Sequence, residues 1–132
     1  MTDAYRISVE VTAPLYPTEL PERVEQAITA LFPEAEVSER PGELVGEARA
    51  MERFAERLHE QEIVDAARDV FRRNVEGDAF AFALKKQAAY EGVVNFAVGN
   101  PDELGDLQVR VRVEEPSVEA FIDGLAPPSD ER

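Results

Sequence analysis

The sequence predicts a single α+β domain in which helices cover one face of a largely antiparallel sheet. Three observations predict it: two long segments alternate apolar and polar residues, central segments place apolar residues at helical spacing, and short turns separate the later strands. A chain of 132 residues fits one domain with one core. We expect the domain to span residues 1–125 and a polar tail, residues 126–132, to be frayed.

The clearest predicted strands lie near the two ends of the chain. Residues 5–13 and residues 107–114 both alternate apolar and polar side chains, which is the period of a strand with one buried face. The polar side of the second strand consists of Gln108, Arg110, Arg112 and Glu114. We therefore expect the face of the sheet opposite the helices to be solvated or to contact a partner.

Apolar residues at helical spacing predict the longer helices. The first is expected to run from a cap at Thr18 to Phe32, because a threonine hydroxyl can accept hydrogen bonds from first-turn amides and a proline follows the run. Segments 51–58 and 63–71 carry apolar stripes that are out of phase with each other. This shift indicates two helices with a break at residues 59–62.

Turn-forming pairs divide the remaining segments. Pro41-Gly42 separates two predicted short strands, residues 35–40 and residues 43–48. Gly77-Asp78 is expected to close the helical region. The other elements predicted on such grounds are a strand at residues 79–84, an apolar run at residues 93–98 and a short helix that opens at Pro116-Ser117 and continues to Ile122.

Acidic residues dominate the composition. The chain has 28 aspartates and glutamates against 14 lysines and arginines, a formal net charge of -14, and lysine is almost absent. Such a chain repels itself in ordinary salt, whereas about 1 M salt shortens the Debye length to about 3 Å and screens the repulsion. We interpret the composition as that of a halophile's protein with an acidic surface. A mesophilic acidic protein is the alternative, and it would normally keep more lysine.

Several function classes lack a signal in the sequence. The amino terminus does not resemble a signal peptide, and no apolar segment approaches the roughly 20 residues that cross a bilayer, so we expect a soluble cytoplasmic protein without a membrane contact. Cysteine is absent, and the single histidine, His59, has no neighbour at a metal-binding spacing. No nucleotide-binding loop or nucleophile motif occurs, so we expect no metal, no cofactor, no small-molecule substrate and no enzyme activity.

The only two lysines, Lys85 and Lys86, are adjacent and are followed by Gln87. Because lysine is otherwise absent, their retention suggests a local need to bind an anion such as phosphate. Alternatively, they end an edge strand, where lysine discourages pairing with other strands. Tyr90 could stack on a base, although we expect it to pack inside the protein.

Five arginines are further candidates for a nucleic-acid contact surface. Arg49, Arg53 and Arg57 recur every four residues on one predicted helix. A glutamate follows each of them by three residues, so a solvated helix with weak ion pairs is the alternative. Arg110 and Arg112 share the polar side of the last strand, where a binding face and ion pairs across strands would produce the same pattern.

Residues at fixed spacings carry a family resemblance. The motifs are Met51-x-x-Phe54 with Leu58-x-x-Gln61-x-Ile63-x-Asp65-x-Ala67-Arg68, then Phe82-x-Leu84-x-Lys86-Gln87-Ala88-Ala89, then Gly92-x-Val94-Asn95-Phe96. With them the chain resembles the archaeal uncharacterised protein family 0201 over about residues 6–115. The resemblance implies an RNA-binding protein with a fold similar to that of large-subunit ribosomal protein five, a homodimeric state and no established catalytic residues.

The leading hypothesis is a non-enzymatic RNA-binding module that forms a homodimer and contacts RNA through cationic side chains gathered on one surface. The candidate residues are Lys85, Lys86, Gln87, Arg49, Arg53, Arg57, Arg110 and Arg112. The alternative is a homodimeric protein–protein interaction module whose uncovered sheet face binds a second copy or another subunit, with no nucleic-acid ligand. An enzyme with an unrecognised carboxylate site ranks last.

Overall fold

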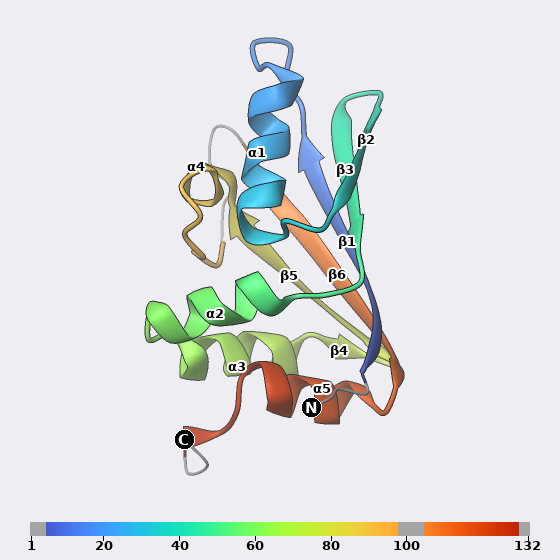
Figure 1. Ribbon diagram of the computed structural model, residues 1–132, viewed down its shortest axis with the longest axis vertical. Coiled ribbons are helices and arrows are strands. Elements are labelled where there is room, and N and C mark those ends of the chain that lie inside the picture. Colours follow the sequence, from blue (N-terminus) through green and yellow to red (C-terminus); the bar gives the residue numbers. More distant parts are fainter. Residues whose placement is uncertain (1–4, 98–104, 130–132) are drawn as a thin grey trace.

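The described residues form one antiparallel sheet. The computed structural model describes residues 5–97 and 105–129. Within these ranges the strands are β1 (Arg6–Pro14), β2 (Glu36–Arg40), β3 (Glu43–Ala48), β4 (Val75–Glu76), β5 (Ala79–Lys85) and β6 (Asp106–Glu115). Their spatial order is β2-β3-β1-β6-β5-β4, and every neighbouring pair is antiparallel. The two strands with the clearest alternation, β1 and β6, therefore lie at the centre of the sheet (Figure 1).

Helices pack on one face of this sheet, as Figure 1 shows. Those in the described part of the chain are α1 (Pro21–Leu31), α2 (Glu52–Glu60), α3 (Val64–Arg73), α4 (Lys86–Tyr90) and α5 (Val118–Leu125). The predicted single α+β domain, with helices on one face of a largely antiparallel sheet, is confirmed. Within the described ranges, every helix is too short or too polar to span a bilayer.

The core lies between the helices and the covered face of the sheet. Alternate residues of β1 and β6, such as Val11 and Val111, are fully buried there. Three phenylalanines join the layers: Phe82 of β5 has its ring centre 5.4 Å from that of Phe54 in α2 and 5.0 Å from that of Phe71 in α3. Burying each such ring stabilises the fold by about 1.5–3 kcal/mol relative to leaving it exposed.

Gly46 of β3 permits a close approach between α1 and the sheet. A Cβ atom at this position would lie 2.9 Å from Cγ2 of Ile28 and 3.4 Å from Cβ of Ala35. The first of these distances is shorter than van der Waals contact allows, so the side-chain-free backbone of Gly46 sets how near α1 can lie to β3.

The helix starts and breaks were predicted with mixed success. The break between α2 and α3 is confirmed, and Glu62 there has a φ of 58°. Ser117 caps α5, since its hydroxyl accepts a hydrogen bond from the amide of Ala120. The predicted cap at Thr18 is wrong: α1 begins at Pro21, and Leu20 occupies the cap position without a side-chain hydrogen bond. Proline at the first helical position is compatible with a helix because that amide has no intrahelical partner.

The pairing of strands tests three local predictions around β5. Gly77-Asp78 forms the turn of the β4–β5 hairpin, because α3 already ends at Arg73. The predicted apolar run at residues 93–98 has Val94 buried and pairs with β5 through one isolated bridge between Leu84 and Phe96, and its last residue lies outside the described residues. The two lysines do not both end a strand, since Lys86 begins α4.

Candidate nucleic-acid interface

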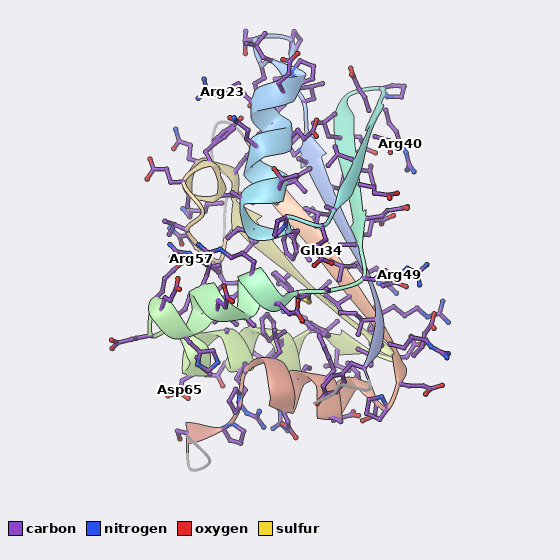
Figure 2. The ribbon with its side chains drawn as sticks, viewed as in Figure 1. Arg23, Glu34, Arg40, Arg49, Arg57 and Asp65 are labelled. Carbon is purple, nitrogen blue, oxygen red and sulfur yellow. The ribbon has the colours of Figure 1, made fainter. Side chains whose placement is uncertain are left out.

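The eight residues predicted to contact RNA lie in four different places. Arg49, Arg110 and Arg112 belong to the uncovered face of the sheet, whereas Arg53 and Arg57 belong to α2 on the opposite side. In Figure 2, Arg49 and Arg57 lie at opposite sides of the molecule. Lys85 and Gln87 lie at the edge near α4, and Lys86 lies in the interior. The expectation that folding gathers all these cations on one surface is therefore wrong.

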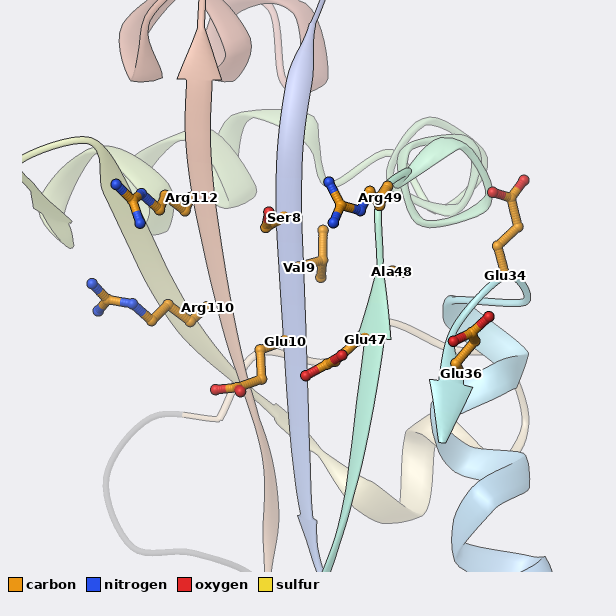
Figure 3. A pocket seen from close by; sticks show the side chains of 10 residues that line it. All are labelled: Ser8, Val9, Glu10, Glu34, Glu36, Glu47, Ala48, Arg49, Arg110 and Arg112. Carbon is orange, nitrogen blue, oxygen red and sulfur yellow. The ribbon is translucent and has the colours of Figure 1, made fainter. Parts of the chain in front are cut away.

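The uncovered face of the sheet, which we call the open face, is hollowed around β1. The concavity has a volume of about 600 Å³ and is lined by residues of β1, β2, β3 and β6, among them Ser8, Glu10 and three arginines. The register places Ser8 opposite Arg112 and Glu10 opposite Arg110. Figure 3 shows Arg110 and Arg112 extending from β6 on one side of β1, and Arg49 on the other side. The strand alternation thus turns Arg110 and Arg112 to the open face, and Arg49, which follows the end of β3, lines the same concavity.

The three arginines of the open face are accessible to an anion. Within the described part of the chain, neither Arg49 nor Arg110 forms an ion pair with a carboxylate. The Nε of Arg112 lies 3.0 Å from the Asp78 carboxylate, with the two side chains 62% and 53% exposed. An ion pair that exposed contributes at most about 1 kcal/mol, so a phosphate could replace Asp78 at little cost.

A row of glutamates crosses the same face. Glu36 of β2 lies opposite Glu47 of β3, and Glu47 lies opposite Glu10 of β1. Like charges directly opposite each other in a sheet are destabilising, and all three side chains are exposed. The open face is therefore divided into an acidic half on β2, β3 and β1 and a basic half on β6, with Arg49 beside the acidic half.

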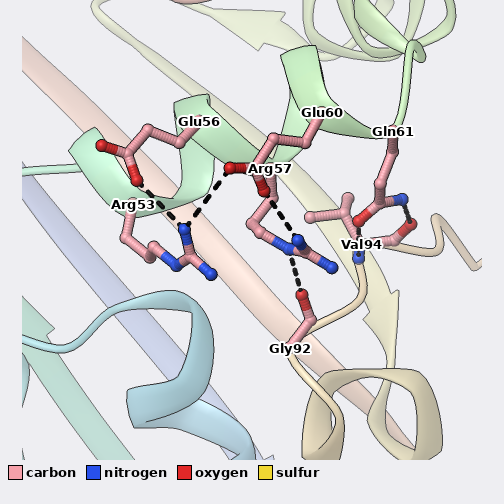
Figure 4. Close-up of polar contacts among 7 residues, drawn as sticks. All are labelled: Arg53, Glu56, Arg57, Glu60, Gln61, Gly92 and Val94. Carbon is pink, nitrogen blue, oxygen red and sulfur yellow. Dashed lines mark hydrogen bonds and ion pairs between the residues drawn. The ribbon is translucent and has the colours of Figure 1, made fainter.

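The arginines of α2 have structural partners. The Nη1 of Arg53 lies 3.1 Å from Glu56 and 3.8 Å from Glu60, and the Nη1 of Arg57 lies 2.7 Å from Glu60. Arg57 also donates through Nε to the carbonyl of Gly92 at 2.6 Å. These contacts, drawn in Figure 4, agree with the alternative interpretation of a helix with ion pairs. They place Glu56 and Glu60 beside the two arginines, where both carboxylates would repel a phosphate.

Gln61 joins Arg57 in attaching α2 to the segment after α4. Its side-chain amide donates to the Val94 carbonyl at 2.9 Å, and its side-chain oxygen accepts from the Val94 amide at 2.8 Å (Figure 4). Gln61, Gly92 and Val94 all belong to the motifs that carry the family resemblance. Their spacing therefore reflects a structural attachment between two distant parts of the chain.

Lys86 is a buried cation. Its Nζ donates to the carbonyl of Pro14 at 2.6 Å and to the carboxylate of Glu19 at 2.9 Å, and it lies 5.3 Å from the ring centre of Tyr16. The side chain of Lys86 is 0% exposed and that of Glu19 is 8% exposed. RNA cannot reach this ammonium group in the folded protein, so Lys86 leaves the set of candidate contact residues. The sequence offers no local sign of this burial, because Glu19 is 67 residues away.

Lys85 and Gln87 line a second concavity of about 750 Å³, which we call the edge pocket. Arg23 of α1, Tyr90 of α4 and Asn95 also line it. Arg23 and Asn95 are not among the residues that the sequence predicts to contact RNA. Asn95 lies within a motif of the family resemblance, but Arg23 shows no pattern that distinguishes it from other surface arginines.

Tyr90 connects the edge pocket to the buried pair. Its hydroxyl lies 3.5 Å from Oε2 of Glu19, and the guanidinium carbon of Arg23 lies 5.8 Å from its ring centre. Burial raises the pKa of Tyr90 above its ordinary value of 10.0, the charge of Glu19 raises it further, and the charge of Arg23 partly opposes the rise. The tyrosine is therefore a neutral, partly buried support under Arg23 at neutral pH.

The described residues give little support for a catalytic or metal site. Within residues 5–97 and 105–129, no cluster of three or more His, Asp or Glu side chains has the geometry to hold a metal ion. His59 is exposed on the last turn of α2. The open-face concavity is lined by three guanidinium groups and by four glutamates. The edge pocket is lined by a guanidinium, an ammonium group, two side-chain amides, a tyrosine ring and the carboxylate of Glu91.

Comparison with known proteins defines the family. A family model described as RNA binding matches residues 8–114. A UPF0201 protein of Methanopyrus kandleri is 41% identical over 134 residues, covering 90% of this chain and 84% of the relative. The crystal structure of a UPF0201 protein from Methanococcus jannaschii has a TM-score of 0.85 at 34% identity, covering 92% of this chain and 94% of that one.

These matches, together with the fold, define a single-domain α+β protein whose family model carries an RNA-binding description. The chain belongs to the archaeal UPF0201 family. The family resemblance inferred from the sequence motifs is thereby confirmed. The expected likeness to large-subunit ribosomal protein five remains a prediction.

Proposed function

We propose that the protein is a non-enzymatic RNA-binding module whose open face binds the phosphate backbone through Arg49, Arg110 and Arg112. The observation that carries this proposal is the presence of three exposed guanidinium groups around one concavity, two of them without an ion pair in the described part of the chain. A guanidinium group matches two oxygens of a phosphate with paired hydrogen bonds. The family model's description supports RNA as the source of the phosphates.

The glutamate row limits the path that RNA can take on this face. Phosphates are repelled by Glu10, Glu36 and Glu47, so the backbone is expected to follow β6 and to avoid β2 and β3. Toward β5 the face carries the small side chains of Ala81 and Ala83, opposite Arg110 and Gln108. The strand β6 and its neighbour β5 therefore offer the strip with the least repulsion.

The test compares two double variants with the same change in charge. Arg110→Ala/Arg112→Ala removes two cations from the open face, and Arg72→Ala/Arg73→Ala removes two exposed cations from α3. Binding to a structured RNA is measured by filter retention over a range of potassium chloride concentrations. The first variant should lose at least about tenfold in affinity, since a hydrogen bond to a charged group contributes about 1.5–3 kcal/mol and about 1.4 kcal/mol is tenfold. The second should change little.

An equal loss in the two double variants would show a general charge effect instead of a site on the open face. Absence of RNA binding by the unaltered protein at every salt concentration would reject the proposed function. Each phosphate contact removed should also reduce the slope of log affinity against log salt concentration by about one, because one fewer counterion is released on binding.

The second candidate function is self-association through the open face. Two copies could meet face to face about a twofold axis. The acidic half of each copy would then lie against the basic half of its partner. Arg110→Glu and Glu10→Arg should each give a monomer by light scattering, and the combined swap should restore the dimer. A dimer unaffected by either single swap would reject this interface.

We further propose a cytoplasmic protein from a cell with a high internal salt concentration. The net charge of -14 supports this proposal, because screening by about 1 M salt removes most of the repulsion among surface carboxylates. The thermal midpoint of unfolding should rise with potassium chloride up to molar concentrations. In such salt, affinity for RNA must come from short-range hydrogen bonds and stacking, since the contribution of counterion release falls steeply.

A further inference from the structure

The edge pocket combines a planar cation with an aromatic support. Arg23 is exposed, and its guanidinium carbon lies 5.8 Å from the ring centre of Tyr90. The guanidinium group therefore lies over the ring, and we call its side away from the ring the outer face. Within the described residues, Arg23 forms no ion pair with a carboxylate. Guanidinium planes and aromatic rings are the surfaces on which unpaired RNA bases stack.

Two side-chain amides border the same pocket. Gln87 of α4 and Asn95 are both exposed, and in the described part of the chain neither side-chain amide is used in a hydrogen bond to another residue. Each amide offers one acceptor oxygen and a donor group, the combination that pairs with the edge of a nucleobase. A lone cation site for phosphate would not need such amides, so the lining favours a base as the ligand.

The pocket is held in place by contacts from distant parts of the chain. The backbone carbonyl of Asn95 accepts a hydrogen bond from the amide of Lys85 at 2.8 Å. Arg57 and Gln61 of α2 bind the carbonyls of Gly92 and Val94 on the same segment. The position of Asn95 relative to Gln87 is thus set before any ligand arrives, which lowers the entropic cost of binding.

Lys86 supports the stacking surface from below. Its ammonium group binds Oε1 of Glu19, the Tyr16 amide also donates to Oε1 at 2.9 Å, and Oε2 of the same carboxylate lies 3.5 Å from the Tyr90 hydroxyl. The order of contact is therefore Lys86, Glu19, Tyr90 and Arg23. This chain of contacts joins the buried Lys86 to the residue under Arg23: Lys86 holds the Glu19 carboxylate in place and lies out of reach of a ligand.

Resting on the proposed RNA-binding function, we infer that the edge pocket binds one unpaired nucleobase, which stacks on the outer face of Arg23 and forms hydrogen bonds with Gln87 and Asn95. Lys85, at the end of β5, lies on the rim of the pocket and also faces the open side of the sheet by strand parity. A single-stranded RNA segment whose backbone follows β6 and β5 would therefore deliver a base to this pocket.

The test uses Arg23→Lys, which keeps the charge and removes the planar group. The matched control is Arg72→Lys on α3, also an exposed arginine. Affinity for a short single-stranded oligoribonucleotide should fall about tenfold in Arg23→Lys, as expected for loss of one base-stacking contact, and should be unchanged in Arg72→Lys. In the unaltered protein, the side-chain amide resonances of Gln87 and Asn95 should shift with the oligoribonucleotide.

Two small ligands identify the chemistry that the pocket recognises. Adenosine monophosphate should shift the Gln87 and Asn95 amide resonances, whereas ribose 5-phosphate, which lacks a base, should not. Equal shifts with the two ligands would show an anion site and overturn the inference. Saturation by adenosine monophosphate together with no binding of the oligoribonucleotide would assign the pocket to a free nucleotide instead of RNA and would also overturn it.

The supporting role of Tyr90 has its own variants. Tyr90→Phe keeps the ring but removes the hydroxyl that contacts Glu19, so it should lose less oligoribonucleotide affinity than Arg23→Lys does. Tyr90→Leu removes the ring and should lose affinity to the extent that Arg23→Lys does. If Arg23→Lys binds RNA like the unaltered protein while Arg110→Ala/Arg112→Ala loses affinity, the inference of a base in the edge pocket is wrong and the proposed function of the open face stands. Loss only in Arg23→Lys would reject the open face and leave the base pocket.

Discussion

The buried corner where α1 meets α4 and the open face of the sheet both contain cations, but in opposite surroundings. Lys86 in the corner has no exposed surface and is bound by the carboxylate of Glu19 and the Pro14 carbonyl. Arg110 on the open face is exposed and has no ion pair in the described part of the chain. Burial of a charge requires a partner, whereas an exposed arginine keeps its hydrogen-bond donors for a ligand.

This contrast shows that the rarity of a residue type does not reveal its role. Lysine is scarce in the chain, and that scarcity led us to expect both lysines at a binding surface. One of them is a structural residue of the interior. The arginines of the open face, which belong to the commoner cationic type, are the better candidates for RNA contact.

The largest effect should come from removing the buried cation. Lys86→Ala leaves Glu19 in the interior without its partner, which typically costs about 3–5 kcal/mol of stability. The control is Lys85→Ala at the pocket rim, which should cost less than about 1 kcal/mol because that side chain is partly exposed. The measurement is the free energy of unfolding by urea in potassium chloride. Equal losses in the two variants would remove the distinction between the two lysines.

A side chain added at Gly46 tests the covered face. Gly46→Val places atoms against Ile28 in the space that α1 occupies, and overpacking of this kind costs about 1–3 kcal/mol. Ala83→Val adds the same kind of side chain on the open face and should change stability by no more than about 0.5 kcal/mol. Chemical unfolding of both variants checks the difference. A larger loss in Ala83→Val would mean that the face we describe as open is covered.

The corner should also respond to alkaline pH through Tyr90. Its pKa is raised in the folded protein by burial and by Glu19, so the unfolded chain loses the phenolic proton first. The contribution of this proton to the free energy of unfolding is fully present below about pH 10, the pKa of tyrosine in the unfolded chain. It is lost as the pH rises through the higher pKa of Tyr90 in the folded protein. Tyr90→Phe should therefore make the free energy of unfolding fall less steeply between about pH 9 and about pH 11. Identical slopes in the variant and the unaltered protein would contradict the assignment.

The smallest effect should come from the glutamate row of the open face. Glu47→Gln removes the central charge between Glu36 and Glu10 and should stabilise the protein by about 0.2–1 kcal/mol at low salt. The gain should vanish at about 1 M salt, where charges are screened beyond about 3 Å. Glu39→Gln on β2, which lies opposite Leu44, is the control and should show no such gain. A gain that persists at high salt would exclude repulsion as its cause.

The strands were predictable because each depends on a local period. β1, β5 and β6 follow the alternation of their own residues, and the break between α2 and α3 follows from two stripes that are out of phase. The same parity correctly indicated that Arg110 and Arg112 share the side of β6 away from the core. Short-range patterns of this kind survive folding when tertiary contacts agree with them.

The failed predictions depend on contacts between segments that the period of a single segment does not reveal. Thr18 has the chemistry of a helix cap, but α1 begins three residues later and the neighbouring Glu19 binds Lys86, 67 residues away. The hairpin turn at Gly77-Asp78 exists because β5 pairs back onto β4. The edge pocket could not be found from the sequence. Arg23 and Asn95 come together only because α1 lies beside α4 and because α2 binds the segment that follows α4.

By itself the sequence determined the fold class, the placement of the main elements and the polar side of β6, because these follow from the period of hydrophobic residues along the chain. Only the tertiary structure decided which cations are ligand-accessible. Accessibility depends on which carboxylates and carbonyls from elsewhere in the chain surround each group. Lys86 and Arg110 carry the same sign of charge, but only Lys86 is enclosed by such partners.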